Sequence, residues 1–340
     1  MKLTILLGGP SAEREISFLS GEAMARALAG RGQDVTLLDP ATGRTMRLEE
    51  FTANPPSKEP PTVRELGEYS QGNLMLESLQ SLAVREADVV VLGLHGVPGE
   101  DGLIQAVLEL EGKRYTGSNA RSSALCIDKQ YTKIILEHTG VAVPKGRVIS
   151  KEDHPLERHA AWEWCITELG FPLVIKPNDQ GSTVGLTILR DESQDKFNQA
   201  VDLALDYSSK ALIEEFIDGR ELTVSVLGRE ALPILEIETK GGFYDYEHKY
   251  TPGMSFHTCP AKLPTELASA IQADALKAFE ACGCRGYGRV DFRLHPSGRY
   301  YCLEINTLPG MTSTSLIPDA ARAAGIGFED LCERIVAEAA

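Results

Sequence analysis

Alternating strand and helix signals over residues 1–117 restrict the fold of this chain more than any other feature. Apolar LTILLGG predicts a strand, and the periodic segment SAEREISFLSGEAMARALAGRG after it predicts a helix that stops at glycine. VTLLD and the fully apolar ADVVVLGLHG predict two more strands, the latter central in a parallel sheet, and EDGLIQAVLELEG predicts a second helix. This order is typical of a doubly wound α/β half. Residues 40–80 are rich in Pro, Glu and Ser, and we expect a surface insertion there.

The rest of the chain changes character twice. Residues 118–209 combine two helical segments, DKQYTKIILEHTG and AAWEWCITELG, with the strands FPLVIKP and VGLTILR, which a glycine-bearing loop joins as a hairpin. From residue 210 strands dominate, ending with RVDFRLH and RYYCLEIN before a closing helical segment. A chain of 340 residues is too long for one typical core. We therefore expect an α/β protein, α+β in its C-terminal half, with parts at 1–117, 118–209 and 210–340.

Charge and cysteine usage exclude several classes of partner. The net charge is −15 and no basic cluster occurs, which argues against nucleic acid and against an anionic membrane surface. No apolar run approaches a membrane span, and the N-terminus reads as a buried strand instead of a signal peptide. The seven cysteines form no CxxC pair, so we expect reduced cytoplasmic thiols. Cys282 and Cys284 offer half of a zinc site that no second pair completes.

The stretch YYCLEINTLPGMTSTSL places two oxygen ligands at the end of a strand. Glu304 and Asn306 share a face because side chains in a strand repeat every two residues. If residues 297–298 form a two-residue turn, Asp291 of the preceding strand lies opposite Glu304; another loop length would shift this by one or two residues. Such oxygen ligands suit Mg²⁺, and Arg289 lies on the same face. The alternative is a solvated sheet face of alternating charge.

Two basic positions are candidates for phosphate contacts. Lys176 ends a buried strand just before the glycine–hydroxyl loop at residues 181–183, whose N–H groups and nearby charge suit a phosphate. This is not the P-loop pattern, and a simple turn is the alternative. Lys129 lies on or at the start of a helix, where most lysines are solvated.

Carboxylates and a tyrosine-rich loop mark other candidate positions. Glu214 ends one strand and Glu221 begins the next, which could place carboxylates near ribose hydroxyls. The loop GGFYDYEHKYTPG contains Lys249 and Tyr250 between glycines and is either a lid or a packed surface loop.

Two further candidates lie in the N-terminal part. Glu13 falls in the first turn of the first helix, where a glutamate normally caps the helix or complements its dipole. His95 follows a parallel strand at its C-terminal end, where ligands usually bind.

Taken in order, these motifs resemble the D-alanine–D-alanine ligases of the ATP-grasp superfamily over essentially the whole chain. The resemblance rests on GGPSAERE, LHGVPGEDG, YTGSNARSSALCIDK, VIKPNDQGSTVG, IEEFIDGRELTV, GGFYDYEHKY, GYGRVDF and LEINTLPGMTSTSLIP. It implies a Rossmann-like N-terminal domain followed by a two-part ATP-grasp domain that clamps ATP. Thr183 stands where the family usually has a second serine, and Asp179-Gln180 replaces a commoner basic or acidic pair.

The resemblance also implies a role for each matching residue. Two Mg²⁺ (or Mn²⁺) ions would be held by Asp291, Glu304 and Asn306. ATP would be bound by Lys129, Lys176, Glu214, Phe216, Ile217, Glu221, Phe243 and Lys249. The two D-alanines would contact His95, Ser315 and Leu316. Catalysis, lid closure and oxyanion stabilisation would involve Glu13, Ser182, Tyr250, Arg289 and Gly310.

The expected reaction is condensation of two D-alanines through a D-alanyl phosphate, giving ADP, phosphate and D-Ala-D-Ala for peptidoglycan, by a cytoplasmic homodimer. A D-alanine–D-lactate ligase or another ATP-grasp amino-acid ligase is the alternative. Neutral Tyr250 favours an amine acceptor, whereas a cationic His248, two residues earlier, would favour the hydroxy acid. A nicotinamide oxidoreductase would need GxGxxG after the first strand, which is missing. A nucleotide sensor without activity would not need Asp291, Glu304, Asn306 and Arg289 all intact.

Overall fold

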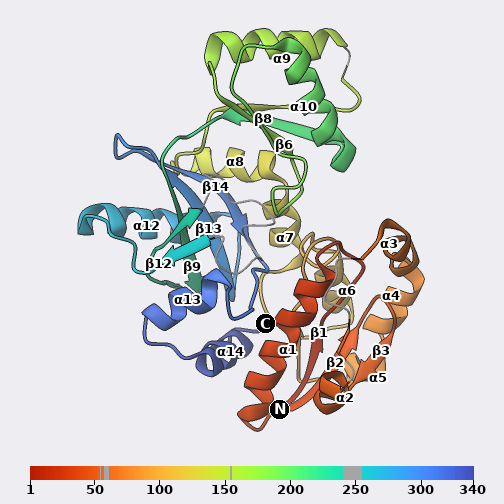
Figure 1. Cartoon of the computed structure of the whole chain (residues 1–340). Helices are drawn as coiled ribbons and strands as arrows, with labels where there is room; N and C mark the ends of the chain where they lie inside the picture. The colour runs from red at the N-terminus through yellow and green to blue at the C-terminus, as the bar shows by residue number, and fades with distance from the viewer. Residues whose placement is uncertain (54, 57–60, 154, 240–254) are drawn as a thin grey trace.

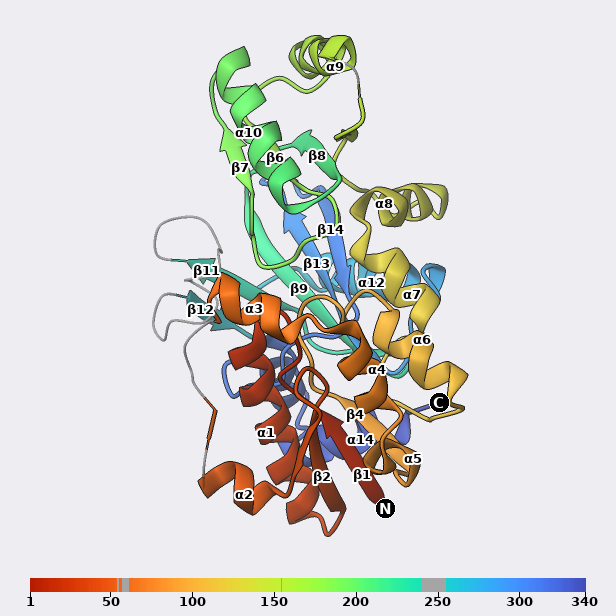
Figure 2. The same cartoon turned by 90° about the vertical axis from the view of Figure 1, so that its right-hand side faces the viewer.

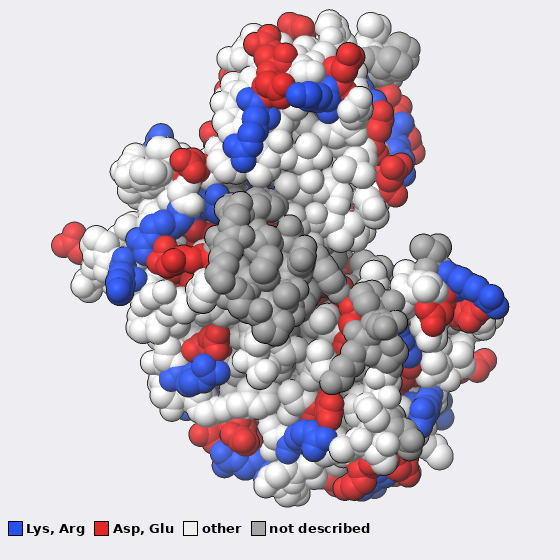
Figure 3. Space-filling view, in the orientation of Figure 1, with Lys and Arg blue, Asp and Glu red and all other residues white. Residues whose placement is uncertain are grey.

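A computed structural model describes residues 1–53, 55–56, 61–153, 155–239 and 255–340. It contains three separate β-sheets, and helices cover each of them (Figure 1). On the face shown in Figure 3, acidic and basic side chains are interspersed. Within the described ranges no helix is both long and apolar enough to cross a membrane.

The N-terminal sheet confirms the predicted parallel α/β arrangement and corrects one detail. Its strands lie in the order β3-β2-β1-β4; β1 pairs in parallel with β2 and β4, whereas β3 runs antiparallel to β2. The apolar strand β4 is therefore not central, although a parallel bridge from Val90 to Tyr115 extends the sheet beyond it. The elements are β1 (Lys2–Leu6), α1 (Arg14–Gly30), β2 (Asp34–Asp39), β3 (Arg44–Met46), β4 (Val89–Leu92) and α6 (Leu103–Leu110).

The segment 40–80 is more than a surface insertion. It supplies β3, and the side chains of Phe51 and Leu79 are buried in the core of the N-terminal sheet. Phe51 lies on the first of its short helices, and its ring is 5.9 Å from that of Phe18 on α1. These helices are α2 (Leu48–Ala53), α3 (Val63–Tyr69) and α4 (Gly72–Leu79), followed by α5 (Leu82–Arg85).

The central sheet is antiparallel and has the order β5-β8-β6-β7. The predicted hairpin is confirmed as β6 pairing with β7, and α9 and α10 share one hydrophobic core with the sheet. In both ribbon views these helices lie at the far end from the N-terminal sheet (Figures 1 and 2). The elements are β5 (Gly146–Ser150), α9 (Pro155–Glu168), β6 (Leu173–Pro177), β7 (Thr187–Leu189), α10 (Gln194–Tyr207) and β8 (Lys210–Glu215).

The C-terminal sheet runs β12-β11-β9-β13-β14, with β10 beside β9. Helix α12 covers one face, and Cys126, Leu136 and Val141 from the segment around α7 and α8 complete that core. The elements are α7 (Ala120–Ile127), α8 (Lys129–His138), β9 (Arg220–Leu227), β10 (Glu230–Ala231), β11 (Leu235–Thr239), β12 (Ser255–Thr258), α12 (Thr265–Ala281), β13 (Tyr287–Leu294) and β14 (Tyr300–Asn306).

The division at residues 117 and 209 stays a prediction, and the sheets do not follow it strictly. Strand β8 begins at Lys210 yet belongs to the central sheet, and the α7–α8 segment packs with the C-terminal core. The closing segment is helical, as predicted, and forms two helices, α13 (Leu316–Ala323) and α14 (Phe328–Ala337). The break falls at Gly325, whose φ of 78° suits glycine.

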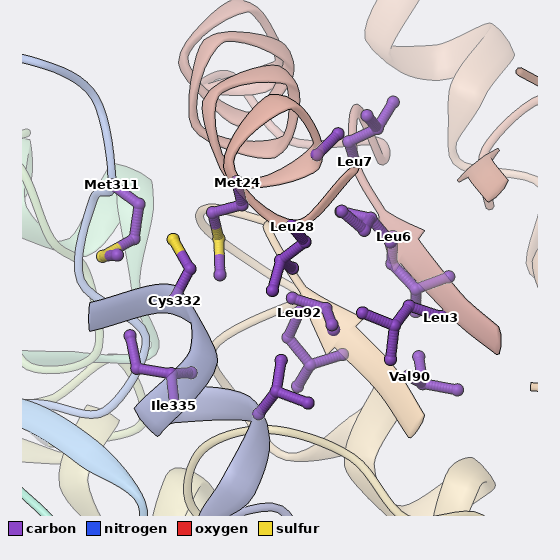
Figure 4. Close-up of a cluster of buried hydrophobic side chains, with 14 of the residues drawn as sticks. Leu3, Leu6, Leu7, Met24, Leu28, Val90, Leu92, Met311, Cys332 and Ile335 are labelled. Atoms are coloured by element: carbon purple, nitrogen blue, oxygen red, sulfur yellow. The ribbon is translucent and has the colours of Figure 1, made fainter. Parts of the chain in front are cut away.

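Helix α14 returns to the N-terminal sheet. Figure 4 shows Cys332 and Ile335 of α14 next to Met24 and Leu28 of α1 and Leu92 of β4. These side chains are almost fully buried. The last helix of the chain therefore completes the core in which the first strand lies.

Candidate active site

Two adjoining cavities bring together the predicted site residues. The larger encloses about 980 Å³ of space when its open mouth is counted. The two cavities share Gly181, Ser182, Arg289, Glu304 and Leu316. The larger is lined also by Lys129, Lys176, Glu214, Phe216, Ile217, Glu221 and Asp291. The smaller is lined also by Glu13, His95, Asn306, Gly310 and Ser315. Every predicted site residue that the structure describes thus lines one of the two.

The hairpin of β13 and β14 brings Asp291 and Glu304 together, but its loop length and the regularity of its strand pairing differ from those expected. Asp291 pairs with Glu304 as predicted. However, His295 N donates to Arg299 O, so the loop has three residues with Gly298 in the left-handed region at φ 86°. A β-bulge next to Asp291 restores the pairing by adding one residue, Leu303, to β14. Leu303 and Glu304 both line the larger cavity.

The predicted metal ligands have oxygen atoms suited to Mg²⁺. Arg289 donates to both carboxylate oxygens of Asp291 at 2.8 and 2.9 Å, and Thr223 Oγ1 donates to one of them at 2.6 Å. Glu304 lies 3.3 Å from the ammonium of Lys129. Asn306 Oδ1 accepts from Leu308 N at 3.2 Å. Two carboxylates and an amide on one face, open to a cavity, fit a hard cation that takes its other ligands from phosphates and water.

A buried ionic triad lies at the side of the larger cavity. Lys176 Nζ is 2.5 Å from Glu214 Oε1, and Lys133 Nζ donates to Glu214 Oε2 and to Pro144 O. Burial opposes ionisation, but the charges of the two lysines prevail and lower the pKa of Glu214 to about 2. Burial lowers the pKa of Lys133, whereas Glu214 raises that of Lys176 against its burial.

Lys133 is a site residue that the sequence reasoning missed. It lies one helical turn after Lys129 on α8, so both side chains project from one face of the helix. The four-residue spacing of the two lysines in DKQYTK could have predicted that they share this face. Lys129 itself is buried, contrary to the solvated position of most such lysines, and donates to Gln180 O at 2.7 Å.

The loop at residues 181–183 connects the central part to the N-terminal part. Ser182 and Thr183 have φ of 51° and 66°, a left-handed conformation that is costly for residues other than glycine. Ser182 Oγ donates to Glu13 Oε1 at 2.6 Å. Glu13 occupies the N-cap of α1 but makes no side-chain capping bond, so the capping interpretation is wrong and the carboxylate points to the loop instead.

The smaller cavity contains a second group of polar side chains. His95 Nε2 is 2.9 Å from Ser20 Oγ, which also accepts from Met311 N, next to Gly310. Ser315 is the N-cap residue of α13, yet its Oγ accepts from Thr312 N at 2.9 Å instead of from the helix. The first N–H groups of α13, with Leu316 at the cavity wall, therefore have no side-chain cap and suit an anion.

Arg293 organises the end of the larger cavity and was also missed. Its guanidinium donates to Glu221 Oε2 at 3.1 Å and to Ile217 O at 3.2 Å, and lies 5.8 Å from the ring centre of Phe216. Its position on β13, two residues after Asp291, could have predicted this role. Arg289, Asp291 and Arg293 lie on one face because side chains in a strand repeat every two residues.

Three predicted site residues, Phe243, Lys249 and Tyr250, lie outside the described residues, as does the rest of the predicted lid. Their roles stay predictions.

Comparisons with known proteins cover nearly the whole chain. The family model "D-ala D-ala ligase N-terminus" matches residues 2–118, and "D-ala D-ala ligase C-terminus" matches residues 135–337. A D-alanine–D-alanine ligase from Desulforamulus reducens is 41% identical over 99% of this chain and 97% of its own. One from Synechococcus sp. is 40% identical over 100% of this chain and 93% of its own.

Solved structures give the same picture. The D-alanine–D-alanine ligase from Bacillus anthracis complexed with ATP has a TM-score of 0.77 at 29% identity, covering 99% of this chain and 97% of that one. The VanG D-Ala:D-Ser ligase from Enterococcus faecalis has a TM-score of 0.78 at 28% identity, covering 98% of each chain.

Proposed function

The chain belongs to the D-alanine–D-alanine ligase family, and from this membership we propose how its two cavities carry out the reaction. The fold is that of the ATP-grasp ligases, and the enzyme is an ATP-dependent ligase that joins two D-alanines for peptidoglycan synthesis. One observation best supports separate sites for ATP and for the amino acids. The larger cavity, lined by Lys129 and Lys176, meets the smaller cavity at Ser182, Arg289 and Glu304. ATP occupies the first, and the two amino acids occupy the second.

The ATP-binding residues act on different parts of the nucleotide. Lys129 and Lys176 contact the phosphates, where their charge favours phosphoryl transfer. The backbone of Phe216 and Ile217, beside Glu214, binds adenine, and Glu221 binds the ribose. Asp291, Glu304 and Asn306 hold two Mg²⁺ (or Mn²⁺) ions, which, when bound, spread the negative charge of the transferring phosphoryl group. Phe243 and Lys249 of the predicted lid complete the enclosure.

In the first chemical step, the carboxylate of one D-alanine attacks the γ-phosphorus, and ADP leaves. Glu13, held by Ser182 and close to His95, binds the ammonium of this D-alanine. The product, D-alanyl phosphate, is an activated acyl donor that water would destroy. The predicted lid, with Tyr250, excludes water during this step.

In the second step, the amine of the other D-alanine attacks the acyl carbon, phosphate leaves, and the amine loses a proton. The tetrahedral oxyanion is stabilised by Arg289 and the N–H of Gly310. Ser315 and the N–H of Leu316 bind the acceptor carboxylate at the start of α13.

A different acceptor is the second candidate, because the VanG neighbour, a D-Ala:D-Ser ligase, has the same fold over nearly its whole length. Alanine is favoured because the curated relatives named above, which are D-alanine–D-alanine ligases, are more similar in sequence. Neutral Tyr250 would favour an amine acceptor, D-alanine or D-serine, over D-lactate, whereas a cationic His248 in the same loop would favour D-lactate.

The test is ATP-dependent phosphate release with D-alanine, followed by product analysis when D-alanine competes with D-serine or D-lactate. We expect D-Ala-D-Ala to dominate at neutral pH. Comparable D-Ala-D-lactate or D-Ala-D-serine would contradict the assignment of the acceptor, and no phosphate release would contradict the assignment of the cavities.

We also propose a homodimer in the cytoplasm, where ATP is available; the measured mass in solution tests the oligomeric state.

A further inference from the structure

Three cysteines that the proposed reaction does not use meet at the end of α7. Cys126 lies in the last turn of α7, Cys282 ends α12, and Cys284 follows two residues later. The sulfur atoms of Cys126 and Cys284 are 3.4 Å apart, and Cys282 lies in the same hydrophobic core as Cys126. Residues 158 positions apart in sequence are thus in direct thiol contact.

The packing around these thiols holds the two segments together. Ser122 Oγ, one turn before Cys126, donates to Gly283 O at 2.6 Å. Arg285 N, next to Cys284, donates to Ser118 Oγ at 3.2 Å. The contact between sulfurs therefore lies between two hydrogen bonds that join the same segments.

Accessibility differs among the three thiols. Cys126 and Cys282 are each 3% exposed, whereas Cys284 is only partly buried. A small oxidant from solvent would therefore reach Cys284 first. The sulfurs of Cys126 and Cys284 would then need to approach by about 1.4 Å to reach the length of a disulfide bond.

We propose that Cys126 and Cys284 form a peroxide-sensitive modification site in which the two thiols become a disulfide that slows the enzyme. Hydrogen peroxide oxidises the Cys284 thiol to a sulfenic acid and is itself reduced to water. The Cys126 sulfur then attacks the Cys284 sulfur and the hydroxyl leaves as a second water molecule. Two thiols and one peroxide give one disulfide and two waters, so the balance needs no other reactant.

Contacts with Cys282 and Cys284, together with burial, raise the pKa of the Cys126 thiol. Cys126 therefore keeps its proton until its sulfur attacks, and that proton leaves with the hydroxyl of Cys284 as water. Cys282, in the same core as Cys126, is the competing thiol that peptide mapping distinguishes.

The site is linked to the ATP cavity through short stretches of chain. Cys126 lines a small cavity together with Lys129, Glu304 and Asn306. It lies three residues before Lys129, while Cys284 lies five residues before Arg289. Drawing the sulfurs together shifts the start of α8 relative to β13, and a misplacement of about 1 Å can cost up to about a hundredfold in rate. This effect on turnover rests on the proposed function, whereas formation of the bond does not.

The experiment treats the full-length reduced enzyme with hydrogen peroxide, alkylates the free thiols and maps the peptides by mass spectrometry. Phosphate release with D-alanine is measured in parallel, before oxidation, after it, and after dithiothreitol. We expect a Cys126–Cys284 peptide, an activity loss of at least about tenfold, and recovery on reduction. Cys284→Ser should keep the activity of the reduced enzyme and lose its sensitivity. Cys259→Ser, which changes another partly buried thiol, should stay sensitive.

Several results would overturn the proposal: a bridge from Cys126 to Cys282 or between molecules, irreversible sulfinate at Cys284 without a bridge, or a bridge that leaves turnover unchanged. Peptide mapping of the unmodified sequence needs no variant, so a poorly folded mutant does not weaken the test. If the reduced enzyme releases no phosphate with D-alanine, the proposed function fails, while the mapping still decides whether the bridge forms.

Discussion

Among single residues, Glu214 affects both the stability of the fold and the shape of the larger cavity. Its buried carboxylate neutralises two buried lysines beside that cavity. Removing one partner from a buried ionic network leaves an uncompensated charge, which costs more than the network contributes as a whole. The carboxylate therefore fixes Lys176 of β6 at the cavity wall and, through Lys133, ties α8 to strand β8 of the central sheet.

We expect Glu214→Gln to lower the free energy of unfolding by about 3–5 kcal/mol near neutral pH, because Lys133 and Lys176 lose their counter-charge. The pKa of Glu214 falls from 4.5 to about 2 on folding, so its ionised form stabilises the protein fully above about pH 4.5 and loses this effect as the pH falls toward 2. The gap between the variant and the unaltered enzyme should therefore close with acidification.

Urea unfolding at a series of pH values measures this gap. Glu168→Gln, at the exposed pair with Lys145, is the matched control and should cost no more than about 1 kcal/mol. A gap for Glu214→Gln that stays constant from neutral pH down to about pH 2 would refute the ionised triad.

Glu304 allows a sharper test of the metal assignment. Glu304→Gln keeps the shape of the side chain but removes its charge, and we expect turnover to fall roughly a hundredfold, about 3 kcal/mol, with the fold intact. Steady-state phosphate release at saturating Mg²⁺ checks this, with Glu266→Gln on the exposed start of α12 as control. Near-normal turnover of Glu304→Gln would remove Glu304 from the metal site.

Residue-level reasoning from sequence had a clear limit here. Motifs identified Glu214 and Lys176, but not Lys133, the second lysine that pairs with Glu214. They likewise identified Asp291 but not Arg293. Lys133 and Arg293 contact other protein side chains and backbone as well as lining or bordering the site. Their importance depends on which carboxylates the fold brings to them, and a single sequence does not contain that information.

Among elements, the hairpin of β13 and β14 has the predicted pairing of Asp291 with Glu304, but two features that were not predicted produce it. The turn has one residue more than the pattern suggested, and the bulge at Leu303 compensates for it. Turn length and bulges depend on local backbone strain and on packing against neighbours, so alternation along the sequence does not reveal them. The same bulge adds an apolar side chain to the wall of the ATP cavity.

We expect Leu303→Ala to raise the KM for ATP about fivefold with little change in kcat, because an apolar contact of about 1 kcal/mol is lost equally in the ground and transition states. Leu110→Ala, at a leucine that is 88% exposed, is the control. Initial rates over a range of ATP concentrations distinguish the two parameters. A fall in kcat at constant KM would show that the bulge positions Glu304 instead of contacting the nucleotide.

For the whole molecule, the elements and the hairpins within each part followed from local patterns, but the strand order of the N-terminal sheet and the packing between parts did not. Helix α14 completes the core of the N-terminal sheet, and α7 with α8 completes the C-terminal core. Such contacts join residues hundreds of positions apart. An amphipathic helix shows that it has a buried face, but not which sheet covers that face.

Ile335→Ala tests this long-range contact. Ile335 on α14 is fully buried, so its truncation should cost about 2–5 kcal/mol. We expect hydrogen exchange to accelerate in β1 and β4 of the N-terminal sheet, with Arg334→Ala, which is exposed, as control. Faster exchange confined to α13 and α14 would contradict a shared core.

The return of α14 to the first sheet has a consequence for protein synthesis. A chain leaves the ribosome starting from its N-terminal side, so β1 emerges more than 300 residues before α14, which completes its core. Until residues 328–337 have been translated, part of the apolar surface of the N-terminal sheet stays uncovered. A chain that stops before residue 328 would keep that surface exposed to chaperones and proteases.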